Sequence, residues 1–281
     1  MKPRTVLASV GVWSLALVCT VQARIAAPMP LPLRLANADC VVVGKVVSIE
    51  DKTVAAPLER GGDQKVEYKI ALVKIDEGLF GAKGLTHVRV GFLPGNAQVG
   101  RSRFEHMYHA VGQEACFILT KHFADPSFLV APAYSLVIPK GDKAGTNFDE
   151  EMKRVRRCTQ VLNDPDAALK APTAGDRFLA AALLIARYRN ADRGTKTEAI
   201  PAEQSKRILA ALAEADWTQR DPQTQLTPHQ VFAMLNLQAA DGWNPPVFKD
   251  VLKEFPVAAQ KWLKDHPDFR IQRYLPDAAQ R

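Results

Sequence analysis

The chain has 281 residues, of which 47% are hydrophobic and 24% are charged, and its formal net charge is +7. This composition is typical of an ordinary globular protein, and the length is sufficient for two domains. The isoelectric point near 9.2 suggests nucleic-acid binding, but the distribution of the charges argues against it.

The densest basic run, residues 153–157, follows directly on three acidic residues at 149–151. We interpret the acidic residues as the first turn of a helix and the basic residues as its later turns. This order suits the helix dipole, because carboxylates are stabilised near the N-terminus and cations further along. A solvated helix face is therefore favoured over a site for nucleic acid or another polyanion.

Residues 1–23 have the features of a signal peptide. Lys2 and Arg4 give a positive start, residues 6–21 are nearly all apolar, and small residues precede a cleavage site near Ala23. A retained membrane anchor is the alternative, but the apolar run is short for a span of ~20 residues. We expect export to the periplasm or the extracellular space, with no membrane span after signal removal. Loss of Lys2 and Arg4 lowers the net charge from +7 to +5.

Three cysteines remain after the signal peptide: Cys40, Cys116 and Cys158. An oxidising compartment allows one disulfide with one thiol left over, in three possible pairings. Three buried free cysteines are equally compatible with the sequence. The chain has no Cys-x-x-Cys, so neither a redox motif nor a zinc ribbon is indicated.

Residues 24–36 contain prolines in alternation and predict an extended leader with no core of its own. In residues 41–49 both alternating sets of side chains are apolar, which predicts a strand in the middle of a curled sheet. Gly44 marks the place where such a strand can bend sharply.

Four further strand patterns follow. A polar loop at residues 51–65 precedes them, and a segment at 101–110 predicts a short helix or a loop. In the second strand the alternation slips by one at Leu72-Val73, as a β-bulge would cause. Together the five strands predict an OB-like Greek-key β-barrel. Their patterns cover residues 41–49, 66–75, 88–92, 115–121 and 128–138, the last interrupted by Pro132. In the fourth strand the alternation predicts Phe117 and Leu119 on one face and Cys116 and Ile118 on the other.

The stretch from Ala38 to Val46 (ADCVVVGKV) resembles the start of netrin/TIMP-like OB modules of secreted proteins. The strand from Gly112 to Leu119 (GQEACFIL) is similar to a later part of these modules, and the resemblance covers residues 37–163. Tissue inhibitors of metalloproteases chelate the zinc of their target with an N-terminal cysteine. This mature chain is expected to begin near Arg24, so the resemblance implies the fold but not that inhibitory mechanism.

Beyond Ala171 the apolar period becomes helical. The chain therefore predicts an α+β protein with a barrel at residues 37–165 and a small helical domain at residues 172–281. Thr227-Pro228-His229-Gln230 gives the clearest local pattern, an N-cap, a proline in the first turn and a capping box. Other helices are predicted at residues 178–188 with a cap near Thr173, at 208–215 after Pro201, at 248–255 until a stop or kink at Pro256, and around Trp262 and Leu263.

Glu105, His106 and His109 form the sharpest candidate for chemistry. Two histidines three residues apart can bind one metal from a single helical turn, with Glu105 or Cys116 as further ligands. His122 is a further residue that could join them in space. The segment lacks the His-Glu-x-x-His order that places a general base between two ligands. A polar loop or helix is therefore favoured, and no metal ligand is assigned.

The remaining patterns do not indicate catalysis. The chain has no Gly-x-Ser-x-Gly motif, and carboxylate pairs such as Asp76-Glu77 are adjacent residues that point apart. Gly78, Gly81 and Gly84 lack the Lys-Ser/Thr of a P-loop. We assign no catalytic residue and no cofactor, and expect a non-catalytic protein.

The leading hypothesis is an exported, non-catalytic binding protein whose partner is an extracytoplasmic protein or polymer. Ligands of OB folds commonly bind to a face of the barrel and its connecting loops, here residues 51–65 and 122–127. One alternative is a metal-binding or metal-dependent envelope protein that uses His106 and His109. Another is a structural component of the envelope.

Overall fold

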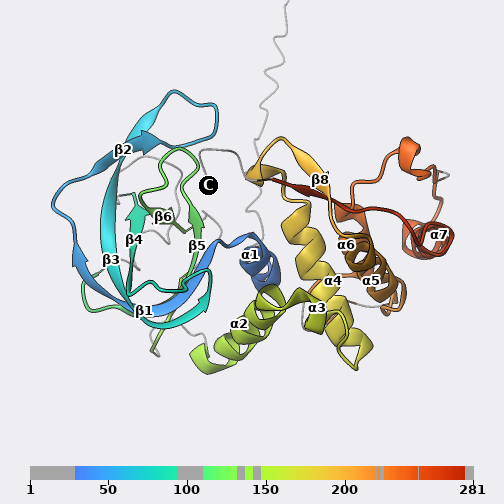
Figure 1. The fold of residues 1–281 in the computed structure, drawn as a ribbon, viewed down its shortest axis with the longest axis horizontal. Helices are drawn as coiled ribbons and strands as arrows, with labels where there is room; N and C mark the ends of the chain where they lie inside the picture. Colours follow the sequence, from blue (N-terminus) through green and yellow to red (C-terminus); the bar gives the residue numbers. More distant parts are fainter. Residues whose placement is uncertain are drawn as a thin grey trace, which may run out of the picture.

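A computed structural model describes residues 29–93, 110–131, 137–141, 147–218, 220–221, 225–245 and 247–275. Over these residues the chain has a seven-stranded, mostly antiparallel sheet, a two-stranded sheet and seven α-helices (Figure 1). The predicted α+β class is confirmed. The predicted signal peptide and the pair His106 and His109 lie outside the described residues. Among the helices described, none has both the length and the apolar character that a membrane span requires.

Five strands of the large sheet pair with one another in a cycle. β1 (Cys40–Ile49) pairs with β3 (Lys65–Phe80) and with β5 (Glu114–Lys121), and β3 pairs with β4 (His87–Phe92). The short β6 (Leu129–Val130) lies between β4 and β5, and its pairing with β4 is the parallel one. β2 (Val54–Pro57) pairs with β3, and β7 (Ile138–Pro139) pairs with β5.

The strands of this cycle turn alternate side chains toward one buried cluster. β1 contributes Val42, β3 contributes Val73, β4 contributes Val90 and β5 contributes Phe117, while the partly buried Leu129 of β6 packs against them. Because successive side chains of a strand point to opposite faces, the other faces of β1 and β5 are turned outward.

The two predicted faces of β5 are confirmed. Phe117 and Leu119 lie in the cluster inside the cycle, whereas Cys116 and Ile118 lie in the cluster beneath the helices. All four side chains are at most 1% exposed. The strand is apolar on both faces, since one face packs inside the cycle of strands and the other packs beneath the helices.

The pairing of β1 with β3 is irregular, and one irregularity lies between Val43 and Gly44, where the sequence predicts a bend. A Cβ atom at Gly44 would lie only 2.3 Å from the carbonyl oxygen of Lys74. The backbone of β3 therefore approaches too closely for any side chain at this position.

The slip predicted at Leu72-Val73 is an irregularity of β1 rather than of β3. Val46 lies opposite Val73 and Ser48 lies opposite Leu72, so Val47 is the extra residue. Over the same residues β3 keeps a regular register against β4. The alternation along β3 fails because adjacent residues are buried on both of its faces.

The extended leader predicted at residues 24–36 is wrong where the structure describes it. α1 (Leu31–Asn37) has Pro32 in its first turn and buries Leu35 and Ala36 completely. Proline is compatible with a first turn because the N–H groups there have no acceptor within the helix. A helix of two turns is too short to show a helical period in the sequence.

The loop predicted over all of residues 51–65 is also wrong, because it contains β2. This strand has four residues and ends at Pro57, so its pattern is short. Its pairing with β3 buries Ala56 beside Tyr68 and Ile70.

The helix starts predicted in the C-terminal part are confirmed. α4 (Ala174–Tyr188) begins at Thr173, whose Oγ1 accepts a hydrogen bond of 3.1 Å from the Asp176 N–H. α5 (Ala202–Ala213) follows Pro201, and α6 (Pro228–Met234) begins with the complete capping box at Thr227. α2 (Phe148–Asn163) has its three acidic residues in the first turn, and the short α3 (Pro165–Ala168) follows it.

α7 (Val251–Asp265) passes through Pro256, so the predicted separation into two helices is wrong. Proline removes one backbone hydrogen bond from a helix interior. Ala259, Trp262 and Leu263 are buried beyond it, and their packing keeps the helix continuous.

β8 (Thr197–Ala199) and β9 (Gln272–Tyr274) form the small second sheet, and three residues each are too few for an alternating pattern. Two 3-10 turns, η2 (Ala191–Arg193) and η3 (Ala239–Asp241), complete the described elements.

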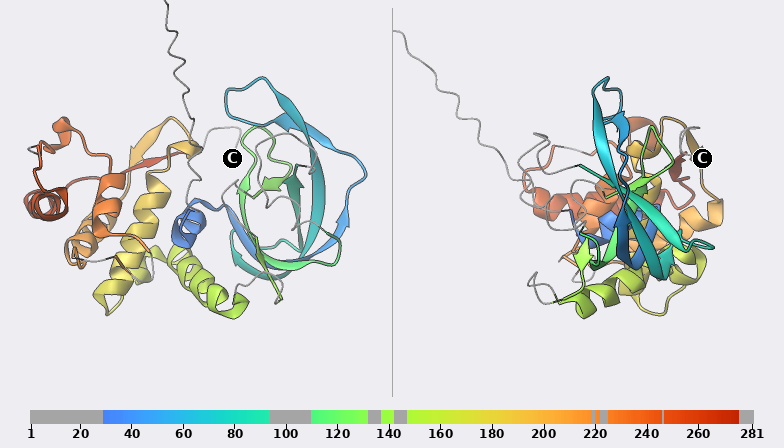
Figure 2. Two further views of the ribbon diagram at one scale, coloured as in Figure 1. Left: turned by 180° about the vertical axis from the view of Figure 1, so that it is seen from behind. Right: turned by 90° about the vertical axis from the view of Figure 1, so that its left-hand side faces the viewer.

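The large sheet and the helices share one hydrophobic core. The outward faces of β1 and β5 supply Val41 and Ile118, α2 supplies Met152, and α4 is buried along its length from Phe178 to Ala186. α1 lies between the sheet and α4 (Figures 1 and 2). The helical part is therefore packed against the sheet rather than connected to it by an exposed linker.

A partly buried guanidinium joins α4 to α1 at the edge of this core. Arg187 Nη1 donates hydrogen bonds to the carbonyl oxygens of Ala36, at 3.0 Å, and Ala38, at 2.9 Å. Its guanidinium lies 5.0 Å from the centre of the Phe80 ring. Burial lowers the pKa of Arg187 to about 10, and the positive charge of Arg193 acts in the same direction.

Arg187→Met should destabilise the fold, because methionine fills a similar volume but leaves the carbonyl oxygens of Ala36 and Ala38 without this donor. We expect the free energy of unfolding, measured by urea denaturation, to fall by about 1–3 kcal/mol. Arg154→Met removes an exposed ion pair with Glu151 on α2 and is the matched control. It should change the free energy by less than about 1 kcal/mol, and equal losses in the two variants would contradict a special role for Arg187.

Candidate functional site

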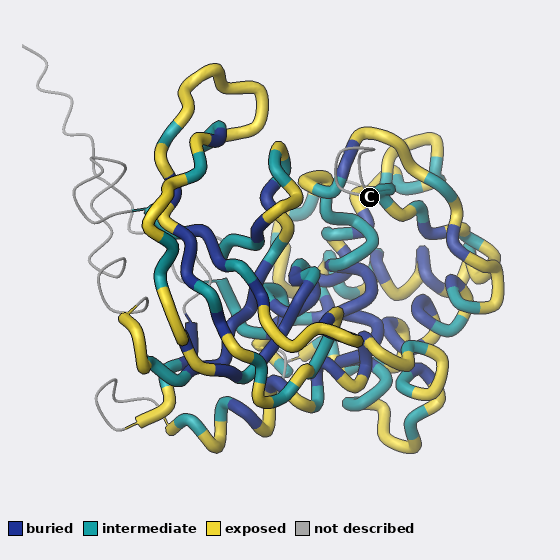
Figure 3. The backbone as a smooth tube through the Cα atoms, turned by 60° about the vertical axis from the view of Figure 1, so that its left-hand side comes forward, coloured by how far each residue is buried: buried dark blue, intermediate teal, exposed yellow. Residues whose placement is uncertain are grey.

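The structure brings together residues 51–65 and 122–127, the two segments that the sequence analysis proposes for binding. β2 and β3 form a hairpin that projects beyond the rest of the sheet (Figures 1 and 2). At its tip, the Leu58 N–H donates to the Gln64 carbonyl at 3.2 Å, and Gly61 has a φ of 73°. The tip is exposed from residue 59 onward (Figure 3).

His122 holds the two segments side by side. Its Nδ1 accepts hydrogen bonds from the backbone N–H groups of Ala124, at 3.3 Å, and Asp125, at 3.1 Å. Because Nδ1 is an acceptor, the ring proton is on Nε2, which donates to the Pro57 carbonyl oxygen at 3.1 Å. The residue is only 2% exposed, and burial lowers the pKa of the His122 imidazole below 6.5.

Aromatic rings surround His122 on both sides. The ring centres of Tyr68, Phe123 and Phe128 lie 5.3, 4.7 and 4.8 Å from that of His122. The Arg60 guanidinium of the hairpin tip lies 5.5 Å from the centre of the Phe123 ring, at a distance typical of a cation–π contact. The hairpin therefore contacts the connection after β5 through packing as well as through the hydrogen bond of His122.

An ion pair supports the other side of this connection. Arg89 on β4 donates to both carboxylate oxygens of Glu50, at 2.7 and 2.8 Å, and its Nη1 donates to the Ser127 carbonyl at 3.0 Å. These hydrogen bonds with Arg89 hold the pKa of the Glu50 carboxyl below its usual value. Arg89 and Glu50 are 39 residues apart, so the sequence gives no indication that they form a pair.

The exposed charges around the two loops have both signs. A mixed field of this kind does not attract a polyanion but can complement the charges of a protein surface. The exposed positive residues are Lys52, Arg60, Lys65, Lys69 and Lys121, and the exposed negative residues are Asp51, Glu59, Asp63 and Glu67.

The described residues give no indication of a metal centre. They contain no group of three or more His, Cys, Asp or Glu side chains that could hold a metal ion. His122, which the sequence offers as a third ligand, already uses both ring nitrogens in hydrogen bonds. The other two predicted histidines, His106 and His109, lie outside the described residues.

The three cysteines are free thiols in the structure, and all three are buried. Burial raises the pKa of Cys40 to about 11 and the pKa values of Cys116 and Cys158 to about 12. A thiol becomes a nucleophile or a metal ligand as the thiolate, so these cysteines are suited to packing rather than to chemistry.

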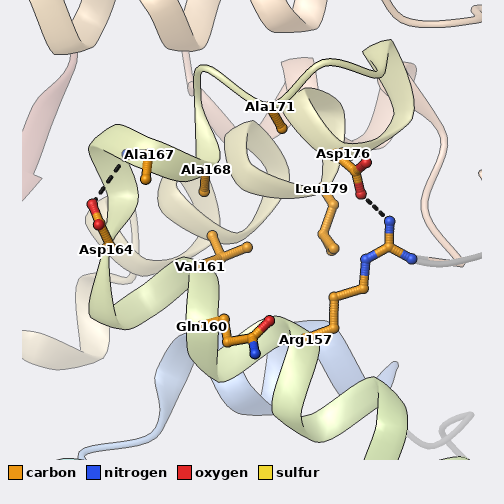
Figure 4. A pocket seen from close by; sticks show the side chains of 9 residues that line it. All are labelled: Arg157, Gln160, Val161, Asp164, Ala167, Ala168, Ala171, Asp176 and Leu179. Atoms are coloured by element: carbon orange, nitrogen blue, oxygen red, sulfur yellow. Dashed lines mark hydrogen bonds and ion pairs between the residues drawn. The ribbon is translucent and has the colours of Figure 1, made fainter.

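A hollow of about 300 Å³ lies between α2, α3 and α4 (Figure 4). Its charged groups already bind one another or the backbone, since Arg157 pairs with Asp176 and Asp164 accepts a hydrogen bond of 3.0 Å from the Ala167 N–H. The wall between them is lined by small and apolar side chains, among them Ala168. This hollow is a weaker candidate than the loops around His122.

Comparisons of the chain with protein-family models, with curated proteins and with solved structures found no match.

The lowered pKa of His122 predicts that part of the stability is lost in acid. Above about pH 6.5 the imidazole is neutral in both the folded and the unfolded chain. As the pH falls below 6.5, the unfolded chain binds a proton that the folded protein does not yet accept. The free energy of unfolding should therefore decrease until the pH is below the folded pKa.

His122→Asn should remove this component, so that the stability difference between wild type and variant shrinks between about pH 7.5 and about pH 5. Urea denaturation across this range measures it. Lys52→Gln, an exposed change in the neighbouring loop, is the control and should retain the wild-type pH dependence. A constant difference between wild type and His122→Asn would show that His122 does not couple stability to pH.

Proposed function

We propose that the protein is an exported, non-catalytic binding protein that recognises a protein partner through residues 51–65 and 122–127. The observation that carries the proposal is the arrangement around His122. Two loops that are distant in the sequence are fixed side by side, while the charged tip of the hairpin stays exposed. A rigid base with exposed polar loops is the usual arrangement of a recognition surface.

The finer fold assignment is part of the same proposal. We assign the five strands of the cycle to an OB-like Greek-key barrel, supported by the order of their pairings and by the cluster that they enclose. The connections between the strands of OB folds commonly bind ligands, and residues 51–65, which include β2, and residues 122–127 are connections of this kind. Residues 37–163 are proposed to form a netrin/TIMP-like module.

The inhibitory chemistry of that family is not part of the proposal. Cys40, the first cysteine after the signal peptide, is 3% exposed and lies within β1. Its thiol has a pKa raised to about 11, so it is suited to packing and not to chelating the zinc of another protein.

The mixed charge around the loops supports a protein partner over nucleic acid. Export by the signal peptide at residues 1–23 places that partner outside the cytoplasm. The proposed organisation is a barrel at residues 37–165 and a helical domain at residues 172–281, packed on one core.

The combined change Glu59→Ser, Arg60→Ser and Asp63→Ser tests the proposal at the hairpin tip. Mature protein, residues 24–281, is cross-linked and captured from the envelope fraction of its host. We expect one stoichiometric protein partner with wild type and a loss of at least about tenfold with the variant, because it removes three exposed charges of the tip without removing β2.

The matched control is Glu203→Ser with Lys206→Ser, two exposed charges on α5. This variant should capture the partner as wild type does. Equal capture by the hairpin variant, with the same circular dichroism spectrum as wild type, would contradict binding through these loops.

A further inference from the structure

A second hollow of about 300 Å³ lies in the helical part of the protein. It is bordered by the ends of α4 and α6, by η3 and by the residues that lead into β9. α6 and α4 lie beside the small sheet in this region (Figure 1). Leu235 and Ile271 are buried at the hollow whereas Asn236 is exposed, so it extends from the surface to an apolar floor.

Arg189 lines this hollow with most of its hydrogen-bonding capacity unused. The residue follows the last turn of α4, and its guanidinium lies 5.4 Å from the centre of the Tyr274 ring. Nη1 makes one long hydrogen bond, 3.4 Å, to the Gln272 carbonyl. Nε is buried and has no acceptor within the described part of the chain. A guanidinium has five N–H donors, so an additional acceptor can be bound.

Arg270 contributes a second positive charge to the wall of the hollow. Its Nε and Nη2 donate to the carbonyl oxygen of Ile200, at 3.1 and 2.5 Å. This acceptor is neutral, so it fixes the guanidinium without neutralising its charge. Among the described residues, neither Arg189 nor Arg270 forms an ion pair with a carboxylate.

A carboxylate of fixed position completes the polar part of the hollow. Asp241 Oδ2 accepts a hydrogen bond of 2.8 Å from the Gln238 N–H, which restrains the side chain. The neighbouring Asn236 has a φ of 51°, in the left-handed region that asparagine tolerates better than most residues. The residues that line the hollow therefore include two positive charges, one negative charge and the side-chain amides of Asn236 and Gln272 beside an apolar floor.

We propose that this hollow binds a small zwitterion with an apolar side chain, of the class of the apolar α-amino acids. The ligand carboxylate would accept hydrogen bonds from Arg189 and Arg270, since guanidinium–carboxylate pairs are among the strong charge-assisted hydrogen bonds. The ligand ammonium would complement Asp241. Its side chain would lie against Leu235 and the partly buried Phe269.

The charge pattern argues against two simpler ligands. A phosphate dianion would meet the carboxylate of Asp241 and has no apolar part for the floor. A fatty acid would fill the floor and bind the guanidinium groups, but it would leave Asp241 without a positive partner. The zwitterion satisfies both signs of charge and also the apolar surface.

Titration calorimetry of the mature protein with L-leucine, L-leucinamide and inorganic phosphate tests the proposal. L-Leucine should bind saturably. L-Leucinamide, which lacks the carboxylate, and phosphate, which lacks the ammonium and the side chain, should each bind at least about tenfold more weakly. Absence of saturable L-leucine binding would overturn the proposal, as would equal affinity for leucinamide or phosphate.

Two variants locate the binding. Arg189→Gln and Asp241→Asn should each weaken L-leucine binding about tenfold, because each removes one charge from the hollow. Asp241→Asn retains an acceptor for the Gln238 N–H, so it tests the charge even if Arg189→Gln disturbs the fold. Arg207→Gln removes a partly exposed guanidinium that pairs with Asp166, away from the hollow, and should leave binding unchanged. Unchanged affinity in a folded Asp241→Asn protein would overturn the assigned site.

Discussion

The arrangement of this protein depends on one partly buried, hydrogen-bonded cation. Arg187 projects from α4 to the carbonyl oxygens that end α1, just before the chain enters β1. The last carbonyl groups of a helix have no partner within the helix, so a donor from a neighbouring element can fix where that helix ends. The lowered pKa, about 10, reflects the desolvation of the guanidinium. Its hydrogen bonds and the face of Phe80 offset part of that unfavourable burial.

The same physical arrangement recurs at the connection that follows β5. There His122 donates to the carbonyl oxygen of Pro57 and is enclosed by aromatic rings. In both places a polar side chain crosses between segments that are far apart in the sequence and ends on a backbone carbonyl. Hydrophobic burial supplies most of the driving force for folding but is not directional. These two hydrogen-bonded side chains fix the relative position of the segments, since a displaced segment would leave a polar group without its hydrogen bond.

Patterns that repeat over many residues allowed much of the architecture to be predicted. The alternation around Phe117 assigned both faces of β5, and the local chemistry of Thr227 located the start of α6. Short elements such as β2 and α1 were missed because four to seven residues contain too few periods to be recognised. The slip at Leu72-Val73 was placed on the wrong strand, since a sequence shows burial but not which partner carries the extra residue.

The candidate binding loops were predictable as segments but not as a site. Residues 51–65 and 122–127 stand out as polar connections, yet their proximity rests on contacts of His122 with Pro57 and of Arg89 with Glu50. Such pairs depend on how strands that are distant in the sequence pair in space, and a single sequence does not show that pairing. The hollow beside Arg189 was missed for the same reason, because the residues that line it come from four separate parts of the chain.

The hairpin tip between β2 and β3 has a consequence for how this protein can change over evolutionary time. Strand pairing ends at Pro57 and Lys65, and the residues between them bear little of the packing that secures the fold. Length and charge can therefore vary there at little cost in stability, because loop closure depends only weakly on loop length. The paired strands below the tip tolerate fewer substitutions, because their side chains pack in the core. If the proposed function is right, changes confined to the tip would alter the partner that is bound without altering the strands.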